Sequence, residues 1–282
     1  MIVWIDGELL DLRDARISPL DRGLVVGDGV FETLRVYRGV PFAWRRHLER
    51  LAYSAGGLGL ALPDSDRLRV AANAVIAANA HVDARLRNTV TGGEGPPGSS
   101  RAGATPTAFI VAVPFQPNRA AVRAAVAPWT RNERSATAGL KTISYAANVR
   151  ALAYAEARGA GEALFGNTAG NLCEATGSNV FVVRDGVAVT PPPSAGCLLG
   201  VTRGLLLELA SAVGVEARED DIAMADLSSV SEAFLSSTTR EVQPVSAIAR
   251  DSLDDQALPA PGPIATRLAA AFGDLVARDL DP

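Results

Sequence analysis

The sequence contains a single lysine. Its 27 basic residues are 26 arginines and Lys141, a bias that a GC-rich genome explains wherever only charge matters. Arginine stays protonated and is a poor nucleophile, whereas a lysine amine can lose its proton and form an imine with an aldehyde. Lys141 is therefore a candidate for covalent chemistry. The alternative is a surface lysine kept by chance, and the motifs around Lys141 distinguish the two interpretations.

Cysteine and histidine are almost as scarce. The two cysteines, Cys173 and Cys197, do not make a disulfide framework, and we expect an enzyme or binding protein of the reducing cytoplasm. Together with His47 and His81 they are too few and too poorly spaced for a metal site, so none is predicted. Neither histidine has the setting of a Ser-His-Asp triad.

Long apolar runs and excess positive charge are also absent. No run reaches the roughly 18–20 residues needed to cross a bilayer, and the acidic start of the chain is unlike a signal peptide. A net charge of -4 argues against nucleic acid or an anionic membrane as the main partner. The 282 residues, 48% hydrophobic and 21% charged, predict a soluble globular protein of one large or two ordinary domains.

The hydrophobic pattern predicts an α+β fold with two domains. An N-terminal α+β domain is expected over residues 1–114, a linker over 115–120, and a C-terminal domain over 121–282. Strands are predicted at 2–5, 30–37, 41–44, 86–91, 108–113, 122–129, 162–166, 180–184, 187–190, 233–237 and 241–249. Helices are predicted at 48–58, 64–76, 148–158, 202–213 and 264–277. The apolar run Ala108–Val113 shows no alternation, which predicts burial on both faces.

Two motifs in the second half suit an anion. The run Gly200–Arg203 opens a predicted helix, where unpaired N–H groups and the helix dipole favour a phosphate. An ordinary helix start with a threonine cap is the alternative. The run Ser236–Arg240 places four hydroxyls at the end of a strand, which otherwise indicates a solvated turn.

A carboxylate and a phenol complete a set that an anionic, aromatic aldehyde would bring together. Glu174 lies among small and polar residues just before an apolar strand. A carboxylate that faces a pyridine nitrogen keeps it protonated and makes the ring an electron sink. Tyr145 follows Lys141 by four residues and can hydrogen-bond a ring hydroxyl oxygen beside the imine. Taken singly, the two would be a surface acid in a loop and a core tyrosine.

Six segments in order carry a family resemblance. They are Asp21-Arg22-Gly23 running to Gly27–Thr33, His47–Leu51, Lys141–Tyr145, Glu174–Phe181, Leu199–Arg203 and Phe234–Pro244. With them the chain resembles the class IV aminotransferases, the fold-type IV pyridoxal-phosphate enzymes. That family includes branched-chain and D-amino-acid transaminases and aminodeoxychorismate lyase. The resemblance implies a D-amino-acid-aminotransferase-like fold, with a small N-terminal α/β domain and a larger, β-rich C-terminal domain with helices.

The resemblance also implies roles for single residues. The cofactor would be pyridoxal 5'-phosphate, and Lys141 would be the Schiff-base lysine and the group that moves the proton at the substrate Cα. Glu174 would pair with the pyridine nitrogen and Tyr145 with the ring hydroxyl oxygen. His47 would support the phosphate-binding arginine rather than act as a catalyst. The phosphate would be held by Arg50, the N–H groups of Val201 and Thr202, and Ser237 and Thr238. A small-molecule amino substrate and a homodimer are expected, without nucleic acid or membrane.

Within the family, the run Thr91–Ser99 and the Lys-Thr-x-x-Tyr motif look most like 4-amino-4-deoxychorismate lyase, which forms 4-aminobenzoate and pyruvate for folate biosynthesis. The chain lacks the Arg-x-His pair of D-amino-acid transaminases and the Gly-Gly-Asn-Tyr run common in branched-chain transaminases. A transaminase and a non-catalytic cofactor-binding protein remain alternatives. Typical lyases often have an arginine where this chain has Gly92, so Arg87 and Arg101 become the candidates for the substrate carboxylate, or else surface charges.

Overall fold

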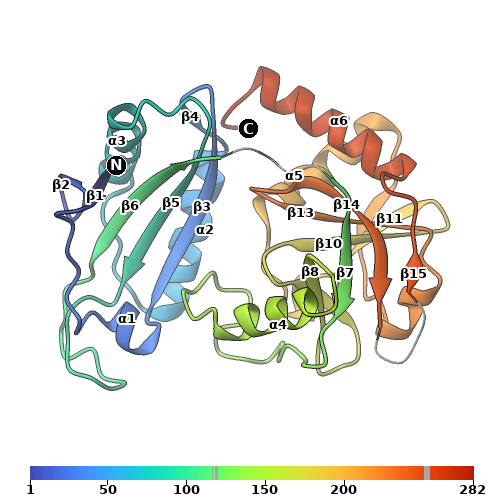
Figure 1. Ribbon diagram of the computed structural model, residues 1–282, viewed down its shortest axis with the longest axis horizontal. Helices are drawn as coiled ribbons and strands as arrows, with labels where there is room; N and C mark the ends of the chain where they lie inside the picture. The colour runs from blue at the N-terminus through green and yellow to red at the C-terminus, as the bar shows by residue number, and fades with distance from the viewer. Residues whose placement is uncertain (116, 118–119, 251–254) are drawn as a thin grey trace. The chain divides into compact units, whose positions relative to one another are not determined.

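Two β-sheets, each in its own part of the chain, organise the structure. The computed structural model describes residues 1–115, 117, 120–250 and 255–282 (Figure 1). Unit 1 comprises Met1–Gln116, Leu140–Tyr145 and Asp279–Pro282, and unit 2 comprises Pro117–Gly139 and Ala146–Arg278. The α+β class is confirmed. Within the described ranges, no helix is long and apolar enough to span a bilayer.

The division differs from the expected domains at two segments, since Leu140–Tyr145 and Asp279–Pro282 both belong to unit 1. The expected boundaries assign Lys141 to the second domain, whereas the segment Leu140–Tyr145 belongs to unit 1. The reason is a pairing of this segment with a strand of unit 1, described below. Residues 116 and 118–119 of the expected linker lie outside the described residues.

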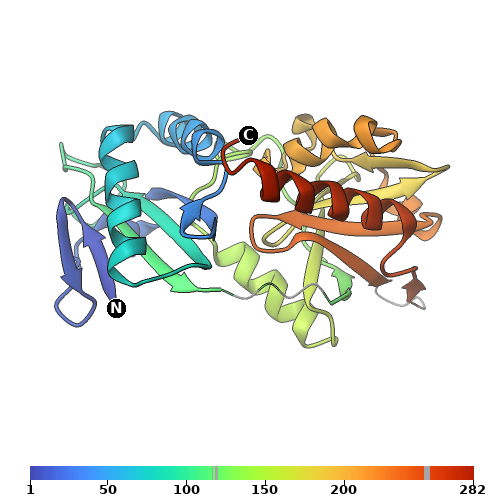
Figure 2. The ribbon, with the colours of Figure 1, turned by 90° about the horizontal axis from the view of Figure 1, so that it is seen from above.

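The sheet of unit 1 is antiparallel, with strand order β2-β1-β6-β5-β3-β4. Its strands are β1 (Ile2–Ile5), β2 (Glu8–Asp11), β3 (Gly29–Tyr37), β4 (Val40–Pro41), β5 (Ala84–Thr91) and β6 (Ala108–Pro114). Its helices are α1 (Arg22–Val26), α2 (Trp44–Leu58) and α3 (Ser65–Ala78). The helix α2 packs on β3, and α3 packs on β1, β5 and β6 (Figures 1 and 2).

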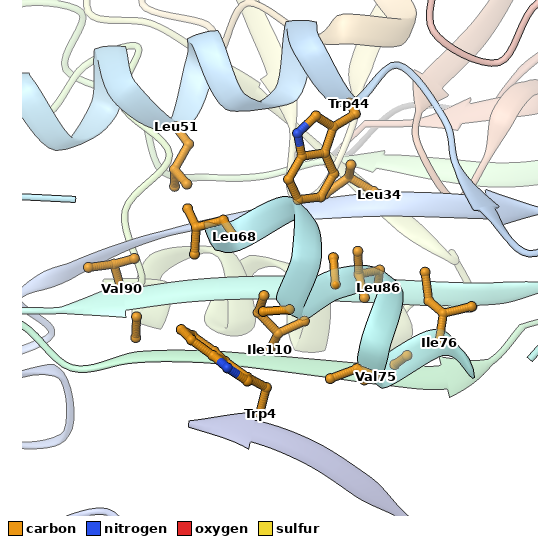
Figure 3. Packing of buried hydrophobic residues seen from close by; sticks show 14 of the residues in the cluster. Trp4, Leu34, Trp44, Leu51, Leu68, Val75, Ile76, Leu86, Val90 and Ile110 are labelled. Atoms are coloured by element: carbon orange, nitrogen blue, oxygen red, sulfur yellow. The ribbon is translucent and has the colours of Figure 1, made fainter. Parts of the chain in front are cut away.

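Alternation along the strands builds the core of unit 1. Side chains two residues apart share a face of a strand, so Leu34, Leu86 and Ile110 lie on the face that α2 and α3 cover. There they meet Leu51 and Leu68 from the helices (Figure 3). The expectation that β6 is buried on both faces is wrong: Ala108, Ile110 and Ala112 are buried, but the residues between them are only half-buried.

The predicted strand at 41–44 is also wrong. The strand β4 is only Val40–Pro41, and Trp44 begins α2 after Ala43, which takes a left-handed conformation at φ 52°. The N–H of Ala43 donates to the carbonyl oxygen of Leu280 at 2.7 Å. Burial of the Trp44 indole in the core therefore favours the helix over the apparent strand pattern.

Unit 2 contains a mixed sheet of order β12-β11-β10-β13-β14-β7-β8-β9, with β15 paired to β14. Its strands are β7 (Val122–Val126), β8 (Glu162–Gly166), β9 (Leu172–Ala175), β10 (Asn179–Arg184), β11 (Val187–Thr190), β12 (Ala217–Glu219), β13 (Glu232–Ser237), β14 (Glu241–Ala249) and β15 (Gln256–Ala257). Its helices are α4 (Ala146–Glu156), α5 (Val201–Ala210) and α6 (Pro263–Arg278). The helices α5 and α6 pack against each other, and both contact β13 (Figure 2).

The N-cap of α3 provides a test of local stability. The Asp64 carboxylate accepts from the N–H groups of Asp66 and Arg67 at 2.9 and 3.2 Å. We expect Asp64→Ala to lower the free energy of unfolding by about 1 kcal/mol, because both N–H groups lose their acceptor. Asp66→Ala, in the same turn but without a capping bond, serves as the control. Urea denaturation in which both variants lose equal stability would contradict the capping role.

Candidate active site

The backbone of Lys141 is anchored to the edge of β3. The N–H of Phe31 donates to the Lys141 carbonyl oxygen at 3.1 Å, and the N–H of Ile143 donates to the Gly29 carbonyl oxygen at 2.9 Å. The Lys141 N–H donates to the buried hydroxyl of Ser54 on α2 at 3.0 Å. These bonds explain why the segment belongs to unit 1.

A glycine in α2 admits this segment. A Cβ at Gly57 would lie 2.7 Å from the Leu140 side chain, closer than real Cβ atoms approach. The missing side chain lets Leu140 pack against the helix, one residue before Lys141. Glycine inside a helix lowers the stability of the helix by roughly 1 kcal/mol relative to alanine. Here it allows the close contact between α2 and Leu140.

The Phe31 ring collects three of the predicted site residues. The Lys141 amine nitrogen lies 4.4 Å from the ring centroid and the Arg87 guanidinium carbon 3.7 Å from it. The Tyr145 ring meets Phe31 edge-on, with centroids 5.3 Å apart and planes at 70°. Both cations thus interact with the π-system of one ring. Of the two substrate candidates, Arg87 shares this ring with the lysine.

On the opposite face of β3, Glu32 binds two side chains of α2. Its Oε1 accepts from Arg50 Nε at 2.8 Å, and its Oε2 accepts from Arg50 Nη2 at 2.7 Å. His47 Nδ1 lies 2.7 Å from the same Oε2. His47 and Arg50 are three residues apart and share a face of the helix. The carboxylate therefore fixes the orientation of the Arg50 guanidinium.

The charges in this network are strongly coupled. Burial acts to raise the pKa of Glu32, but the charge and hydrogen bonds of Arg50, assisted by His47, outweigh it and hold that pKa well below its usual range. Burial is the largest cause that lowers the pKa of His47; Glu32 opposes it, and the charges of Arg50 and then Lys141 lower the pKa further. Glu32 is thus an anion, and His47 is within electrostatic reach of the lysine.

Glu32 was not among the predicted site residues. It stands inside the Gly27–Thr33 motif, as an acid in an apolar strand followed by a histidine and an arginine at helical spacing. A buried carboxylate needs a partner of opposite charge. The pattern could have identified Glu32 as the partner of Arg50.

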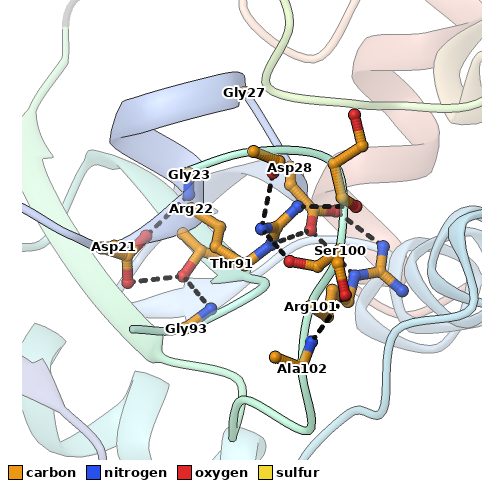
Figure 4. Close-up of polar contacts among 12 residues, drawn as sticks. Asp21, Arg22, Gly23, Gly27, Asp28, Thr91, Gly93, Ser100, Arg101 and Ala102 are labelled. Atoms are coloured by element: carbon orange, nitrogen blue, oxygen red, sulfur yellow. Dashed lines mark hydrogen bonds and ion pairs between the residues drawn. The ribbon is translucent and has the colours of Figure 1, made fainter. Parts of the chain in front are cut away.

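The other substrate candidate, Arg101, is engaged elsewhere in unit 1. Its Nε and Nη2 donate to the carboxylate of Asp28 at 2.8 and 2.6 Å (Figure 4). Its Nη1 donates to the Gly59 carbonyl oxygen at 2.8 Å. The structure thus brings Arg101 to Asp28 and not to the Phe31 ring. Its bonds are those of a residue that holds a loop in place.

The glycine-rich loop after β5 is held by Arg22 as well. Its Nε donates to Asp28 Oδ2 at 3.0 Å, and its Nη1 donates to the carbonyl oxygens of Gly98 and Ser100 at 2.9 and 2.7 Å (Figure 4). The glycine-rich loop is therefore fixed by two arginines on one carboxylate. Asp28 immediately precedes the part of β3 that pairs with the lysine segment.

In unit 2, Glu174 lies in the strand β9 rather than in the expected loop. Its Oε2 accepts from the Leu198 N–H at 3.0 Å, and Arg131 Nη2 lies 3.4 Å from its Oε1. The side chain is 14% exposed, which is compatible with contact to a ligand.

The two cysteines beside Glu174 take no part as nucleophiles. Burial first, and then the Glu174 charge, raise the pKa of the Cys173 thiol, and the same causes raise the pKa of Cys197 to about 12. Both thiols are therefore protonated at neutral pH, and a protonated thiol is a poor nucleophile.

The start of α5 has the donors that an anion requires. Gly200 precedes the helix and no side chain caps it, while Thr202 in the first turn is buried. A Cβ at Gly200 would lie 2.0 Å from Asn179 Oδ1, so only glycine fits there. Among the described residues, the buried Ser236 hydroxyl has no hydrogen-bond partner, and Ser236 pairs with Asn179 across the sheet. Uncapped N–H groups and hydroxyls suit a phosphate.

Two of the predicted phosphate residues follow Ser236. The Ser237 hydroxyl accepts from the Arg240 N–H at 3.2 Å, and Ser237 and Thr238 are half-buried. Asn179 was not predicted, and Ser236 was predicted only as one of the four hydroxyls of the run Ser236–Arg240. A hydroxyl with no protein partner is costly to bury, so the structure identifies Ser236 where the run of four hydroxyls could not.

Comparisons with known proteins show the family of the chain. The model of the family described as amino-transferase class IV matches residues 29–248. A protein of Methanocaldococcus jannaschii named as a branched-chain-amino-acid aminotransferase is 32% identical over 98% of this chain and 96% of its own length. The structure of a branched-chain aminotransferase from Thermoproteus uzoniensis gives a TM-score of 0.90 at 32% identity, over 98% of this chain and 94% of that one.

The chain belongs to the class IV aminotransferase family. It is accordingly a pyridoxal-phosphate-dependent enzyme, and the predicted cofactor and enzyme class are confirmed. A structure from Legionella pneumophila named as a 4-amino-4-deoxychorismate lyase has a TM-score of 0.86 over 94% of this chain and 97% of that one. Its identity is only 23%, so it supports the fold alone.

The Glu32 network makes stability depend on pH. We expect Glu32→Gln to lower the free energy of unfolding at pH 7 by about 3 kcal/mol, because Arg50 and His47 lose a buried anion. The folded pKa of Glu32 lies below its ordinary value of 4.5, so its contribution is complete above pH 4.5 and is lost as the pH falls further. Urea denaturation between about pH 3.5 and 7 measures the difference in the free energy of unfolding between the parent protein and Glu32→Gln. This difference should become smaller below pH 4.5.

Glu49→Gln is the matched control. Glu49 lies on α2 and pairs with Arg45 at 3.2 Å, but its side chain is 63% exposed, so the loss should stay below about 1 kcal/mol. A Glu32→Gln gap of the same size at pH 4 and pH 7 would contradict the depressed pKa.

Proposed function

We propose that Lys141 is the residue that holds the cofactor and moves the substrate proton. Its amine would bind the cofactor covalently and, once released by the substrate, would take the proton from the carbon that carries the substrate amine. When bound, pyridoxal 5'-phosphate supplies an electron sink that lets this carbon lose its proton. The Phe31 ring and the backbone bonds to β3 support this role, because they restrict where the amine can lie.

The other contacts follow from the donors and acceptors at each position. Glu174, an acceptor that is partly exposed, would hold the ring nitrogen, and Tyr145 would donate to the ring hydroxyl oxygen. Arg50, oriented by Glu32, would bind the phosphate. The remaining phosphate contacts would come from the N–H groups of Val201 and Thr202 and from Ser237 and Thr238.

The observation that favours a carboxylate-bearing substrate is the position of Arg87. Its guanidinium and the Lys141 amine contact the same Phe31 ring, at 3.7 and 4.4 Å from the centroid. A substrate whose amine reaches Lys141 can therefore place a carboxylate on Arg87. Guanidinium binds carboxylate with two parallel hydrogen bonds.

We propose 4-amino-4-deoxychorismate as this substrate. Lys141 would take the proton from the ring carbon that carries the amine, the ether bond to the enolpyruvyl group would break, and the proton would return to the methylene carbon of the leaving pyruvate. The ring becomes aromatic, and the product is 4-aminobenzoate. The likeness of the Lys-Thr-x-x-Tyr and Thr91–Ser99 runs to lyases supports this reading.

An amino-acid aminotransferase is the second candidate. The curated relatives with 30–32% identity over nearly the whole chain are named as branched-chain-amino-acid and D-alanine aminotransferases. Both reactions begin with the same proton removal, and they differ in whether a carbon–oxygen bond breaks or an amino group is transferred. We further propose a homodimer in the cytoplasm, as the family resemblance implies.

A product assay separates the two reactions. The holoenzyme is incubated with 4-amino-4-deoxychorismate alone, and separately with L- and D-amino acids plus 2-oxoglutarate. Formation of 4-aminobenzoate and pyruvate without an amino acceptor is the expected result. Glutamate formation from the amino-acid panel, with no 4-aminobenzoate, would replace the lyase by an aminotransferase, and inactivity in both assays would contradict both.

The role of Lys141 has its own test. Lys141→Arg keeps the positive charge near Phe31 but cannot form the covalent link. We expect the variant to fold with unchanged circular dichroism and to lose activity at least 1,000-fold by our order-of-magnitude estimate for a covalent residue. After borohydride reduction, peptide mass analysis should find the cofactor on the Lys141 peptide of the parent protein only. Reductive labelling elsewhere in the parent would reject the assignment.

A further inference from the structure

The strand β5 presents two arginines on the face that is turned away from α2 and α3. Along β5, Ala84, Leu86 and Asn88 are buried, whereas Arg85 and Arg87 between them are exposed. Same-face neighbours in a strand are roughly 6.5 Å apart, so both guanidinium groups can reach one small molecule. Among the residues that the structure describes, neither arginine forms an ion pair.

A third arginine, across the sheet from Arg85, has its own partners in unit 1. Arg35 on β3 is the cross-strand partner of Arg85, but its guanidinium lies against the rings of Tyr37 and Phe115, at 5.0 and 4.5 Å from their centroids. Its Nη2 also lies 3.5 Å from the Asp83 carboxylate. Arg35 thus serves the packing of unit 1, and the uncompensated charge is on Arg85 and Arg87.

These two charges repel each other. Although Arg87 is exposed, the part of its side chain that is covered lowers its pKa; the nearby Tyr145 opposes this effect, and the Arg85 charge lowers the pKa further. An anion that binds both guanidinium groups removes this repulsion, and the larger its charge, the greater the gain.

We propose that Arg85 and Arg87 form a two-cation site for a dicarboxylate, in which Arg85 selects substrates with two carboxylates over substrates with one. Arg87, which shares the Phe31 ring with Lys141, takes the carboxylate nearer the reacting amine, and Arg85 takes the second. The inference rests on the proposed function for the position of the reacting amine. It extends that function by naming the residue that determines the substrate class.

Binding without turnover tests the proposal. Chorismate has two carboxylates and a hydroxyl in place of the amine, and benzoate has one carboxylate. Dissociation constants of both are measured calorimetrically with the holoenzyme. Loss of one charged contact should weaken binding about tenfold. Arg85→Gln should therefore raise the dissociation constant of chorismate by about that factor and leave the dissociation constant of benzoate within about twofold. Arg87→Gln should weaken both ligands, and Arg85→Lys should restore part of the chorismate affinity.

The control removes the same charge elsewhere in unit 1. Arg13 is exposed and paired with Asp11 at 3.1 Å, and Arg13→Gln should leave both dissociation constants unchanged. Equal losses for chorismate and benzoate in Arg85→Gln would overturn the two-cation site. No loss for either ligand would also overturn it, unless the variant selectively weakens binding of 2-oxoglutarate relative to 2-oxobutanoate.

The outcome separates this site from the proposed lyase. If no 4-aminobenzoate forms but Arg85→Gln selectively weakens 2-oxoglutarate relative to 2-oxobutanoate, the two-cation site stands and the lyase is rejected. The opposite result is that 4-aminobenzoate forms, but Arg85→Gln leaves the dissociation constants of chorismate, benzoate, 2-oxoglutarate and 2-oxobutanoate unchanged. The lyase then stands and the two-cation site is rejected.

Discussion

Two adjacent residues of β3 whose side chains point to opposite faces of the sheet hold together the candidate site residues of unit 1. Because successive side chains of a strand point to opposite faces, Phe31 and Glu32 serve different groups. Phe31 lies against the lysine, the arginine of β5 and the tyrosine. Glu32 orients the arginine of α2. A shift of one residue in the pairing of β3 with β5 would exchange the two faces and bury the aromatic ring where the carboxylate is needed.

Much of the fold could be predicted, because hydrophobic periodicity reports directly on the covered face. The strand Ile2–Ile5 appears as expected, and the helix expected at 64–76 is α3. The errors arise where a short run fits two structures. Pro41–Trp44 is apolar enough for a strand, but Trp44 is buried at the start of a helix. The strand β9 has only four residues around the charged Glu174, so its sequence gave no strand signal.

The site shows the same division. Motifs selected Lys141, Tyr145 and Arg87, and the structure brings these three to one ring. The sequence alone could not decide between Arg87 and Arg101 as the residue for the substrate carboxylate. Arg87 precedes the glycine-rich loop and Arg101 follows it, so both lie near the same motif. The difference is a tertiary one: Asp28 binds Arg101 and not Arg87. Glu32 and Asn179 were missed, and Ser236 was not separated from the other hydroxyls of its run, because burial, register and the lack of a partner appear only once the sheets are formed.

The connectivity of the units has a consequence for how such an enzyme can be built or divided. The chain passes between unit 1 and unit 2 four times, and the residues that pair with β3 are separated in sequence from the rest of their unit. A gene fragment that ends at residue 116 would therefore encode the sheet and α2 without the reactive amine or the backbone partners of β3. Recombination at that boundary would join a lysine segment from one parent to a receiving strand from another, so the two halves must be inherited as a matched pair.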